Sequence, residues 1–323
     1  MPFSKILGQE PALQTLERAL ASGHVHHAYR FEGPAGVGKE LAAMALARSL
    51  LCETGGRSAC GSCSACKRAV TFSESPPHVP VHPDLVLVER GLYRAALSST
   101  EASGIGIEQI RRIVLSRVGF PPHEGRALVF IVREASELTP QAANALLKTL
   151  EEPPPKTYFV LLTSRPHRLL DTIRSRTLPV RFSPLSDAVV AEILQRHGLD
   201  PGIATLGQGS AGLAMELANE DAVRERKDFV TAVLEALEAP NLAVATRFAE
   251  GRRFERDALK ELLGHLAQSF AARGREHVAS APAITDRAAR HYELTLQSLE
   301  YVEQNTQPQL TLEALIARLR AQA

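Results

Sequence analysis

A glycine-rich stretch from Gly33 to Glu40 holds the first residues that could do chemistry. Gly33, Gly38 and Lys39 fit the phosphate-loop pattern G-x-x-x-x-G-K, and Gly36 lies between them. Glycines allow a tight turn that points backbone N–H groups at a phosphate, and the lysine adds a positive charge. The pattern continues with Ser or Thr, whose hydroxyl holds Mg²⁺, but this chain has Glu40. Gly33, Gly36, Gly38 and Lys39 are therefore candidate nucleotide-binding residues in a degenerate loop that has lost its metal ligand.

A second position needed for metal binding also departs from the pattern. Residues 127–132 form a continuous apolar run, which is typical of a buried parallel strand. In an active phosphate-loop ATPase such a strand ends in an Asp that holds Mg²⁺. Here the run is followed by Arg133 and Glu134. A guanidinium has no lone pair to offer a cation, so the sequence indicates a second, independent loss from the metal site.

The cysteines predict a separate metal site. All four fall within fifteen consecutive residues with the spacing C-x7-C-x2-C-x2-C, at Cys52, Cys60, Cys63 and Cys66. Two overlapping C-x-x-C turns and a fourth thiol suit tetrahedral Zn²⁺, and because four thiolates fill every position the site should be structural. Scattered structural thiols and an iron–sulfur cluster are the alternatives. His78 and His82 lie nearby but are not expected to be ligands.

Composition limits the function classes. The chain has 323 residues, enough for two or three domains, and 45% of them are apolar. Lys and Arg (37) nearly balance Asp and Glu (36), so no global positive field attracts nucleic acid. No apolar run is long enough to span a membrane, and the N-terminus lacks an apolar signal segment. We therefore expect a cytoplasmic protein whose cysteines are reduced.

The apolar patterns predict an α/β fold in the first half of the chain. Strands and helices alternate, which implies a parallel sheet covered by helices. The expected strands are 27–31, 85–88, 127–132, 158–164 and a short one through Val180, and the expected helices are 4–22, 39–51, 104–118 and one within 138–154 that prolines stop. From about residue 183 the pattern changes to small helices at 187–197 and 211–219, and then to long amphipathic helices.

Four features together resemble a known family, the clamp-loader subunits of the AAA+ class. They are Asn144-Ala145-Leu146-Leu147-Lys148-Thr149-Leu150-Glu151-Glu152-Pro153-Pro154, Val25-His26-His27-Ala28-Tyr29 before the loop, the four-cysteine insert, and Ser175-Arg176. The resemblance covers residues 1–215 and weakly the rest. It implies an AAA+ P-loop domain (1–182) with a zinc-binding four-cysteine module (52–66), a small helical lid domain (183–220) and an all-α collar domain (221–323) for oligomerisation.

Within this family the resemblance separates subunits that hydrolyse ATP (gamma/tau) from one branch with a degenerate site. Glu40 and Arg133 favour the degenerate branch, and so does Gly212, where the ATPase branch has an arginine that senses the γ-phosphate. The family's Ser-Arg-Cys motif supplies an arginine to the ATP of a neighbouring subunit, which makes Arg176 the expected catalytic group in trans. Thr177 replaces the motif's cysteine. Arg174 could substitute, and a simple ion pair of Arg176 with a surface carboxylate is the alternative.

The resemblance implies a non-hydrolysing subunit of the DNA polymerase III clamp loader. Its partners would be the gamma/tau ATPase subunits and the delta subunit, and through the complex the sliding clamp and primed DNA, with ATP bound by the partners. Two alternatives stay open. One is an active ATPase motor in which Glu40 ligates Mg²⁺ and Glu134 is the base. The other is a zinc-stabilised interaction module with partners outside replication.

Overall fold

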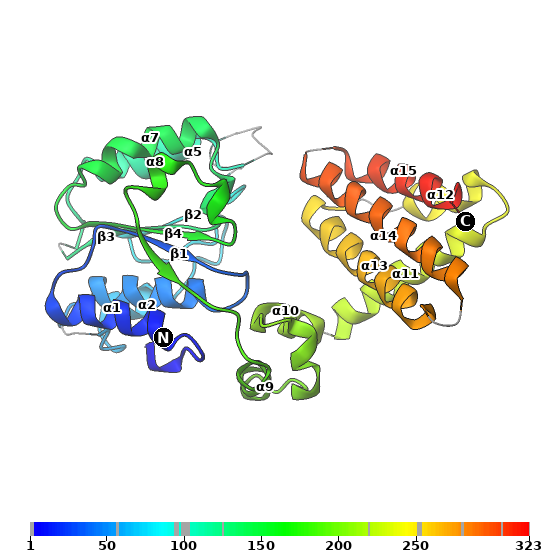
Figure 1. Ribbon diagram of the computed structural model, residues 1–323. Coiled ribbons are helices and arrows are strands. Elements are labelled where there is room, and N and C mark those ends of the chain that lie inside the picture. Colours follow the sequence, from blue (N-terminus) through cyan, green and yellow to red (C-terminus); the bar gives the residue numbers. More distant parts are fainter. Residues whose placement is uncertain are drawn as a thin grey trace. The chain divides into compact units, whose positions relative to one another are not determined.

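The structure is a computed structural model that describes residues 3–55, 58–93, 97, 104–124, 126–218, 220–250, 254–278, 281–304 and 306–322 (Figure 1). The chain divides into two compact units, Met1–Ala218 and Asn219–Ala323. Every helix within the described ranges is too short or too polar to cross a membrane.

A five-stranded parallel sheet forms the centre of the first unit. Its order is β2-β3-β4-β1-β5, and every pair is parallel. The strands are β1 (Ala28–Glu32), β2 (Leu85–Val88), β3 (Leu128–Val132), β4 (Thr157–Thr163) and β5 (Leu178–Arg181). The prediction of a parallel α/β sheet with a helical C-terminal part is confirmed, and the observed strands match the expected ones to within one or two residues.

Helices cover both faces of this sheet (Figure 1). One face carries α1 (Glu10–Ser22) and α2 (Lys39–Leu51), and the other carries α5 (Ile107–Gln109), α7 (Pro140–Glu151) and α8 (Asp171–Arg174). Alternate strand residues enter different apolar clusters, because successive side chains point to opposite faces. Phe31 thus packs on the α1/α2 side, whereas Phe130 and Phe159 stack at 4.9 Å on the other.

Two predicted helices differ from the observed ones. Residues 4–22 are not one helix but a 3₁₀ turn, η1 (Phe3–Lys5), followed by α1. Gly8 lies between them with φ +72°, a left-handed conformation that interrupts a right-handed helix, and Pro11 fits the first turn of α1. The predicted helix 104–118 begins at Ile107 and contains a π-helical segment, so its parts are α5, η2 (Ile110–Leu115) and α6 (Ser116–Val118).

Short elements connect and extend the sheet. The cysteine segment contains α3 (Ser64–Arg68), and 3₁₀ turns follow two strands at η3 (Ala135–Glu137) and η4 (Pro166–Arg168). After β5 come α9 (Asp187–Arg196), η5 (Pro201–Gly207) and α10 (Ala211–Ala218). The Ser186 hydroxyl caps α9 by accepting a hydrogen bond from the Val189 N–H. Asn219, the last residue of the predicted helix 211–219, lies outside the described residues.

The second unit is all-helical. Its helices are α11 (Glu220–Glu238), α12 (Leu242–Glu250), α13 (Arg256–His277), α14 (Pro282–Glu303) and α15 (Pro308–Arg320). The predicted apolar faces meet in one core, in which Phe229, Leu263 and Leu315 are fully buried. The Arg320 guanidinium donates to the Ala236 carbonyl oxygen at 2.6 Å and thus connects the last helix to α11.

Candidate functional site

The glycine-rich loop joins β1 to α2, as the phosphate-loop pattern requires. Gly36 and Gly38 have φ of +70° and +102°, which L-residues with side chains rarely adopt. Gly33 has no room for a side chain, because an added Cβ would lie 2.2 Å from the Phe182 carbonyl oxygen. Lys39 is the first residue of α2. The backbone frame of a phosphate loop is therefore present.

Lys39 is turned onto its own loop. Its Nζ donates to the carbonyl oxygens of Gly33 and Pro34, each at 2.5 Å, and the residue is buried. Burial lowers the pKa of Lys39, while the Glu134 carboxylate opposes this shift. A phosphate would have to take the ammonium away from these two carbonyls before it could be bound.

The two side chains that replace the metal ligands of the pattern pair with each other. The Arg133 guanidinium forms an ion pair with the Glu40 carboxylate and donates to Glu89 Oε2 at 2.6 Å. The two carboxylates together raise the pKa of Arg133, although its burial acts in the opposite direction. Both carboxylates are thus engaged by a fixed positive charge. The guanidinium supplies part of the charge compensation that a divalent cation would otherwise provide.

Glu134 is also fully engaged. Its carboxylate accepts hydrogen bonds from the Ser164 N–H (3.1 Å) and hydroxyl (2.8 Å), from the Ser136 hydroxyl (2.5 Å) and from the Thr163 hydroxyl (3.2 Å). The residue itself is in the left-handed region with φ +42°. A general base must reach a water molecule with a free lone pair, and these contacts already direct the Glu134 oxygens at β4.

Gly212 makes a backbone contact with the loop. Its N–H donates to the Gly36 carbonyl oxygen at 3.0 Å, and a Cβ at position 212 would lie 2.8 Å from the Gly36 Cα. An arginine could not take this place without moving the loop. Between them, the loop, β3 and α9–α10 enclose a cavity of about 740 Å³, lined by apolar residues including Ile6, Leu41 and Met215 and by the charged side chains described above.

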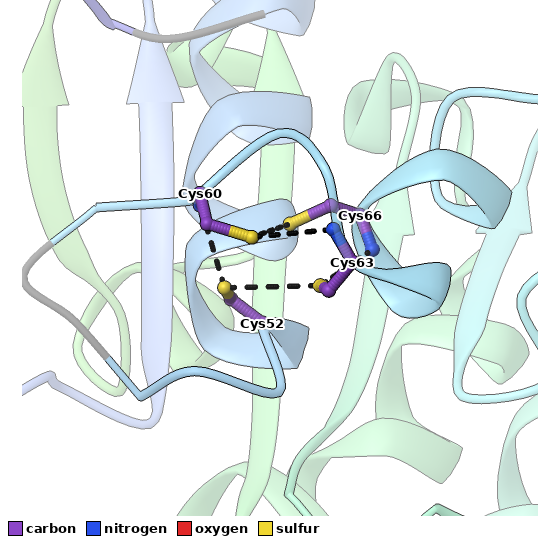
Figure 2. Close-up of side chains that lie close together, drawn as sticks. All are labelled: Cys52, Cys60, Cys63 and Cys66. Carbon is purple, nitrogen blue, oxygen red and sulfur yellow. Dashed lines mark hydrogen bonds between the residues drawn. The ribbon is translucent and has the colours of Figure 1, made fainter.

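The four cysteines come together as the spacing predicts (Figure 2). All four sulfur atoms lie within 4.8 Å of one another, with Cys52–Cys63 and Cys60–Cys66 Sγ–Sγ distances of 4.0 Å. A tetrahedron with Zn–S bonds of about 2.3 Å has sulfurs roughly 3.8 Å apart. The donor set and its spacing therefore fit a zinc ion. Among the described residues neither His78 nor His82 joins this cluster.

Backbone N–H groups point at the sulfurs. The N–H groups of Cys60, Cys63 and Cys66 donate to Cys52, Cys60 and Cys63 Sγ at 3.3–3.4 Å. Such bonds stabilise thiolates, and the Cys63 N–H lowers the pKa of the exposed Cys60 to about 5. Burial raises the pKa of Cys66 to about 12. One thiol is thus ionised at neutral pH, whereas the buried one needs a metal to displace its proton.

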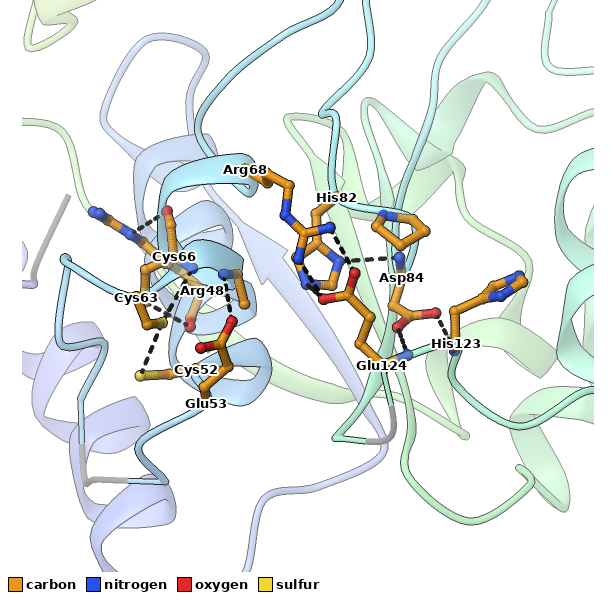
Figure 3. A network of polar contacts seen from close by, with 12 residues as sticks. Arg48, Cys52, Glu53, Cys63, Cys66, Arg68, His82, Asp84, His123 and Glu124 are labelled. Atoms are coloured by element: carbon orange, nitrogen blue, oxygen red, sulfur yellow. Dashed lines mark hydrogen bonds and ion pairs between the residues drawn. The ribbon is translucent and has the colours of Figure 1, made fainter.

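A polar network that sequence reasoning missed ties the cysteine segment to the sheet (Figure 3). Arg68 on α3 forms two hydrogen bonds with the Glu124 carboxylate, at 2.6 and 2.5 Å. His82 Nε2 lies 3.2 Å from the same carboxylate, and the buried Asp84 carboxylate accepts the N–H groups of His123 and Glu124. No sequence spacing links position 68 to position 124; only the fold brings them together.

Arg48 supports the cysteine loop from α2. Its Nε donates to the Cys66 carbonyl oxygen at 2.9 Å and its Nη2 to the Gly61 carbonyl oxygen at 3.2 Å. The Glu53 carboxylate accepts the Ala65 N–H at 2.9 Å. These contacts fix the segment's backbone, and Arg48 could have been suspected from sequence only as a charge within an otherwise apolar helix.

Arg176 lies far from the loop, in the segment between α8 and β5. Its Nε donates to Glu151 Oε1 at 2.6 Å, and its Nη2 pairs with the same carboxylate. Its Nη1 donates to the Thr172 carbonyl oxygen and the Ser175 hydroxyl. The carboxylate pairing that was the alternative for this residue is therefore present. Arg174 instead pairs with Asp171 at 2.8 Å.

The guanidinium of Arg176 borders an open cavity of about 590 Å³, which His26, His27, Glu151 and Leu178 also line. The two histidine rings stack at 4.3 Å, and a ring nitrogen of His27 lies 3.0 Å from the Leu150 carbonyl oxygen. Burial, together with the neighbouring His27, lowers the pKa of His26. Two of the sequence features behind the family resemblance, the His-His pair and the Glu151 segment, thus lie around Arg176.

A family model and the relatives found by sequence point to one family. A family model described as DNA polymerase III, delta subunit, matches residues 8–186. The DNA polymerase III subunit delta' of Bacillus subtilis is 34% identical over 71% of this chain and 65% of its own length. The gamma/tau subunit of Mycobacterium tuberculosis is 36% identical over 61% of this chain and 32% of its own. The chain thus spans less than two thirds of the length of these relatives.

A solved structure is also similar in part. It is a DNA polymerase III gamma subunit-related protein from Thermotoga maritima, with 18% sequence identity and a TM-score of 0.47, and the match covers 96% of this chain and 99% of that one.

Proposed function

The chain belongs to the DNA polymerase III delta-subunit family, and we propose that it is a delta-prime-type, non-hydrolysing subunit of the replicative clamp loader. The observation that carries this proposal is the ion pair of Arg133 with Glu40. These residues stand where a phosphate-loop ATPase has an aspartate and a hydroxyl for Mg²⁺. With a guanidinium between two carboxylates, the chain offsets part of their negative charge without a metal.

Three further features support the loss of hydrolysis. Lys39 is held by the loop carbonyls, and Glu134 is saturated with hydrogen bonds from β4 and its neighbours. Gly212 leaves no arginine to sense a γ-phosphate, and its backbone closes on Gly36. The retained glycines then serve as a scaffold. They hold the loop against the segment that would be the lid domain of an AAA+ protein, residues 183–220, and give the subunit a fixed shape.

The chemically active group of this proposal is Arg176, which acts on a nucleotide bound by a neighbouring gamma/tau subunit. An arginine supplied in this way stabilises charge on the transferring phosphoryl group and contributes about 10³–10⁵ in rate in well-studied cases. Its exposure at an open cavity supports the role. Because Glu151 holds two of its nitrogens, Arg176 must leave this carboxylate to reach a phosphate.

In this proposal zinc has a structural role. Cys52, Cys60, Cys63 and Cys66 would hold it with all four positions filled, so no site is left for a substrate or water. The ion would fix the fold of the segment between α2 and β2. Arg68, Arg48 and Glu53 then transmit this order to the sheet through their bonds to Glu124 and to the backbone of the cysteine segment.

The partners follow from the same proposal. The second unit, residues 219–323, would form the collar through which the subunits assemble, and the first would contact the gamma/tau ATPases and the delta subunit in the cytoplasm. The complex would place the sliding clamp on primed DNA with ATP bound by its other subunits. The gamma/tau relatives of similar identity keep one alternative open, an active ATPase of the gamma/tau type.

Steady-state ATPase assays separate the two functions. The purified chain should show no Mg²⁺-dependent turnover above background, and Lys39→Ala should change nothing. Turnover that Lys39→Ala abolishes would establish the gamma/tau-type alternative. In the reconstituted complex, Arg176→Ala should lower ATP turnover while size-exclusion chromatography shows intact assembly. Arg112→Ala is the matched control, since it removes an exposed arginine that also pairs with a carboxylate but lies outside the segment that carries Arg176. Equal turnover for wild type and Arg176→Ala would exclude the role of Arg176.

A further inference from the structure

One short stretch of the chain is strongly basic. Residues 165–181 contain five arginines, one histidine and a single acidic residue, Asp171, although the whole chain has a formal net charge of only +1. The proposed function uses Arg176 alone. The phosphate loop, the zinc module and the trans-acting Arg176 therefore do not explain the remaining cations of this stretch.

The fold places this stretch along an edge of the sheet. It forms η4, α8 and β5, and β5 is an edge strand that pairs only with β1 among the described strands. The parallel register sets Arg30 beside Pro179 and Glu32 beside Arg181. Since alternate residues of a strand share a face, these four side chains lie on the same side of the sheet.

A recess of about 260 Å³ opens there, lined by Arg30, Glu32, His167, Arg174, Arg181 and two prolines. The buried Arg30 forms its floor. Its Nε donates to Glu32 Oε1 at 2.5 Å, and its Nη1 donates to the Thr177 hydroxyl at 2.7 Å and the Arg174 carbonyl oxygen at 2.8 Å. The floor is thus a fixed and internally neutralised pair that holds α8 and β1 together.

The rim carries cations that are available to a ligand. The Arg181 side chain is 86% exposed, and its nearest carboxylate oxygen, on Glu32, is 4.0 Å away and belongs to a residue that already pairs with Arg30. Arg174 pairs with Asp171, whose side chain is 92% exposed. Exposed pairs of this kind contribute about 0–1 kcal/mol, so a stronger anion can displace them. The exposed Arg168 continues the positive rim.

We propose that this recess and its rim bind phosphate groups of a nucleic acid strand. A planar guanidinium matches a phosphate through two parallel N–H···O bonds, and Arg174 and Arg181 present two such groups on a rigid frame. Protein–protein binding energy concentrates in well-packed, desolvated pockets, whereas this recess is lined by charged side chains and prolines. Contacts to phosphates alone carry no sequence information, so the binding should be independent of sequence and sensitive to salt.

This inference deepens the proposed function, because it names where the subunit would touch DNA, and it rests on that function only for the choice of DNA as the nucleic acid. The DNA-binding measurement needs neither ATP nor partner subunits. Fluorescence anisotropy with the full chain and a labelled primer–template DNA, at several salt concentrations, gives the slope of log K against log salt. Each phosphate contact contributes about 0.9 to this slope for duplex DNA.

Arg174→Gln and Arg181→Gln should each weaken DNA binding for all sequences and reduce the salt slope by about 1. Arg318→Gln, which removes an exposed arginine of the second unit that is bonded to Gln297, should leave both unchanged. If Arg174→Gln loses its fold by circular dichroism, Arg181→Gln alone decides, since the Arg181 side chain is 86% exposed and stabilises little of the fold. The proposal is wrong if the wild-type chain does not bind DNA at low salt, or if both variants keep the wild-type slope.

Loss of co-elution of these variants with the other clamp-loader subunits, with DNA binding intact, would make the recess a protein interface instead. The Arg176→Ala assay measures ATP turnover, whereas this test measures DNA binding. Either proposal can therefore fail while the other stands.

Discussion

The Arg133 guanidinium pairs with the Glu40 carboxylate across the start of α2 and the end of β3. Without Arg133, the Glu40 carboxylate at the mouth of the phosphate loop would lose this counter-charge. Together with Glu89, which accepts a second hydrogen bond from Arg133 at 2.6 Å, they form a local network. Glu40 and Arg133, the two departures from the phosphate-loop pattern, therefore depend on each other. Their ion pair connects the start of α2 to the end of β3.

This pairing predicts that mutations of Arg133 and Glu40 are not additive. Arg133→Ala and Glu40→Ala should each destabilise the first unit, but the double variant should lose about 0.5–1 kcal/mol less than the sum, because each single variant already breaks the pair. Urea unfolding of the four proteins measures this coupling. Leu41→Ala in place of Glu40→Ala is the control, and additive losses for the Arg133–Glu40 cycle would contradict the contact.

Much of this site could be predicted from sequence. The glycine loop, the buried strand before Arg133 and the loss of both metal ligands follow from local patterns, since each depends on residues a few positions apart. The pairing of Arg133 with Glu40 does not, because 93 positions separate them and only the order of the parallel strands brings their ends together. Likewise the closure of Gly212 on Gly36 needs the tertiary structure, because backbone contacts carry no side-chain signal.

The cysteine cluster predicts how many protons zinc releases. Cys60, with a pKa of about 5, is already a thiolate at pH 7, whereas Cys66, with a pKa of about 12, holds its proton until a metal binds. Binding of zinc to the metal-free chain should therefore release fewer than four protons at neutral pH. Calorimetric titrations in buffers of different ionisation enthalpy give the number, and four or more protons would contradict the assigned thiolate.

Loss of the metal should also loosen the first unit. Metal analysis should find about one zinc per chain, and both a strong chelator and Cys66→Ser should lower the thermal midpoint of this unit. Ser62→Ala, between the cysteines, is the matched control because the Ser62 hydroxyl contacts the Cys60 sulfur without being a ligand of the cluster. If the chain held neither zinc nor iron, and chelation left its thermal midpoint unchanged, the four cysteines would be structural thiols without a metal.

His82 predicts a pH dependence of stability. Burial lowers the pKa of His82, with Arg68 acting in the same direction and Glu124 and Asp84 against it. Its Nδ1 accepts the Asp84 N–H, so the neutral ring carries its proton on Nε2, which faces Glu124. The unfolded chain, with a histidine pKa of about 6.5, binds the proton more readily. The stabilisation is therefore complete above about pH 6.5 and is lost as the pH falls below it.

Urea midpoints at about pH 7.5 and about pH 5.5 test this sign, on either side of the unfolded-state pKa. His82→Gln should show a smaller loss on acidification than the wild type, whereas His78→Gln, at an exposed neighbouring position, should behave as the wild type does. The Glu124 carboxylate does not obscure the result. Arg68 lowers its pKa below the ordinary value, so its contribution disappears only at a more acidic pH. A wild-type midpoint that rises on acidification, with His82→Gln flat, would reverse the assignment.

The contact between Glu151 and Arg176 predicts a gain of activity. Glu151 engages Nε and Nη2 of the guanidinium while Nη1 donates to Thr172 and Ser175, so neither edge offers two free N–H groups to a phosphate. Glu151→Gln weakens this hold and keeps the shape of the side chain. Releasing an exposed pair costs about 0.2–1 kcal/mol, so the reconstituted complex should hydrolyse ATP up to about fivefold faster. Glu152→Gln, at the exposed next position, should leave turnover unchanged. A fall in turnover for Glu151→Gln, with assembly intact, would mean that the carboxylate positions Arg176 for the partner's nucleotide and does not restrain it.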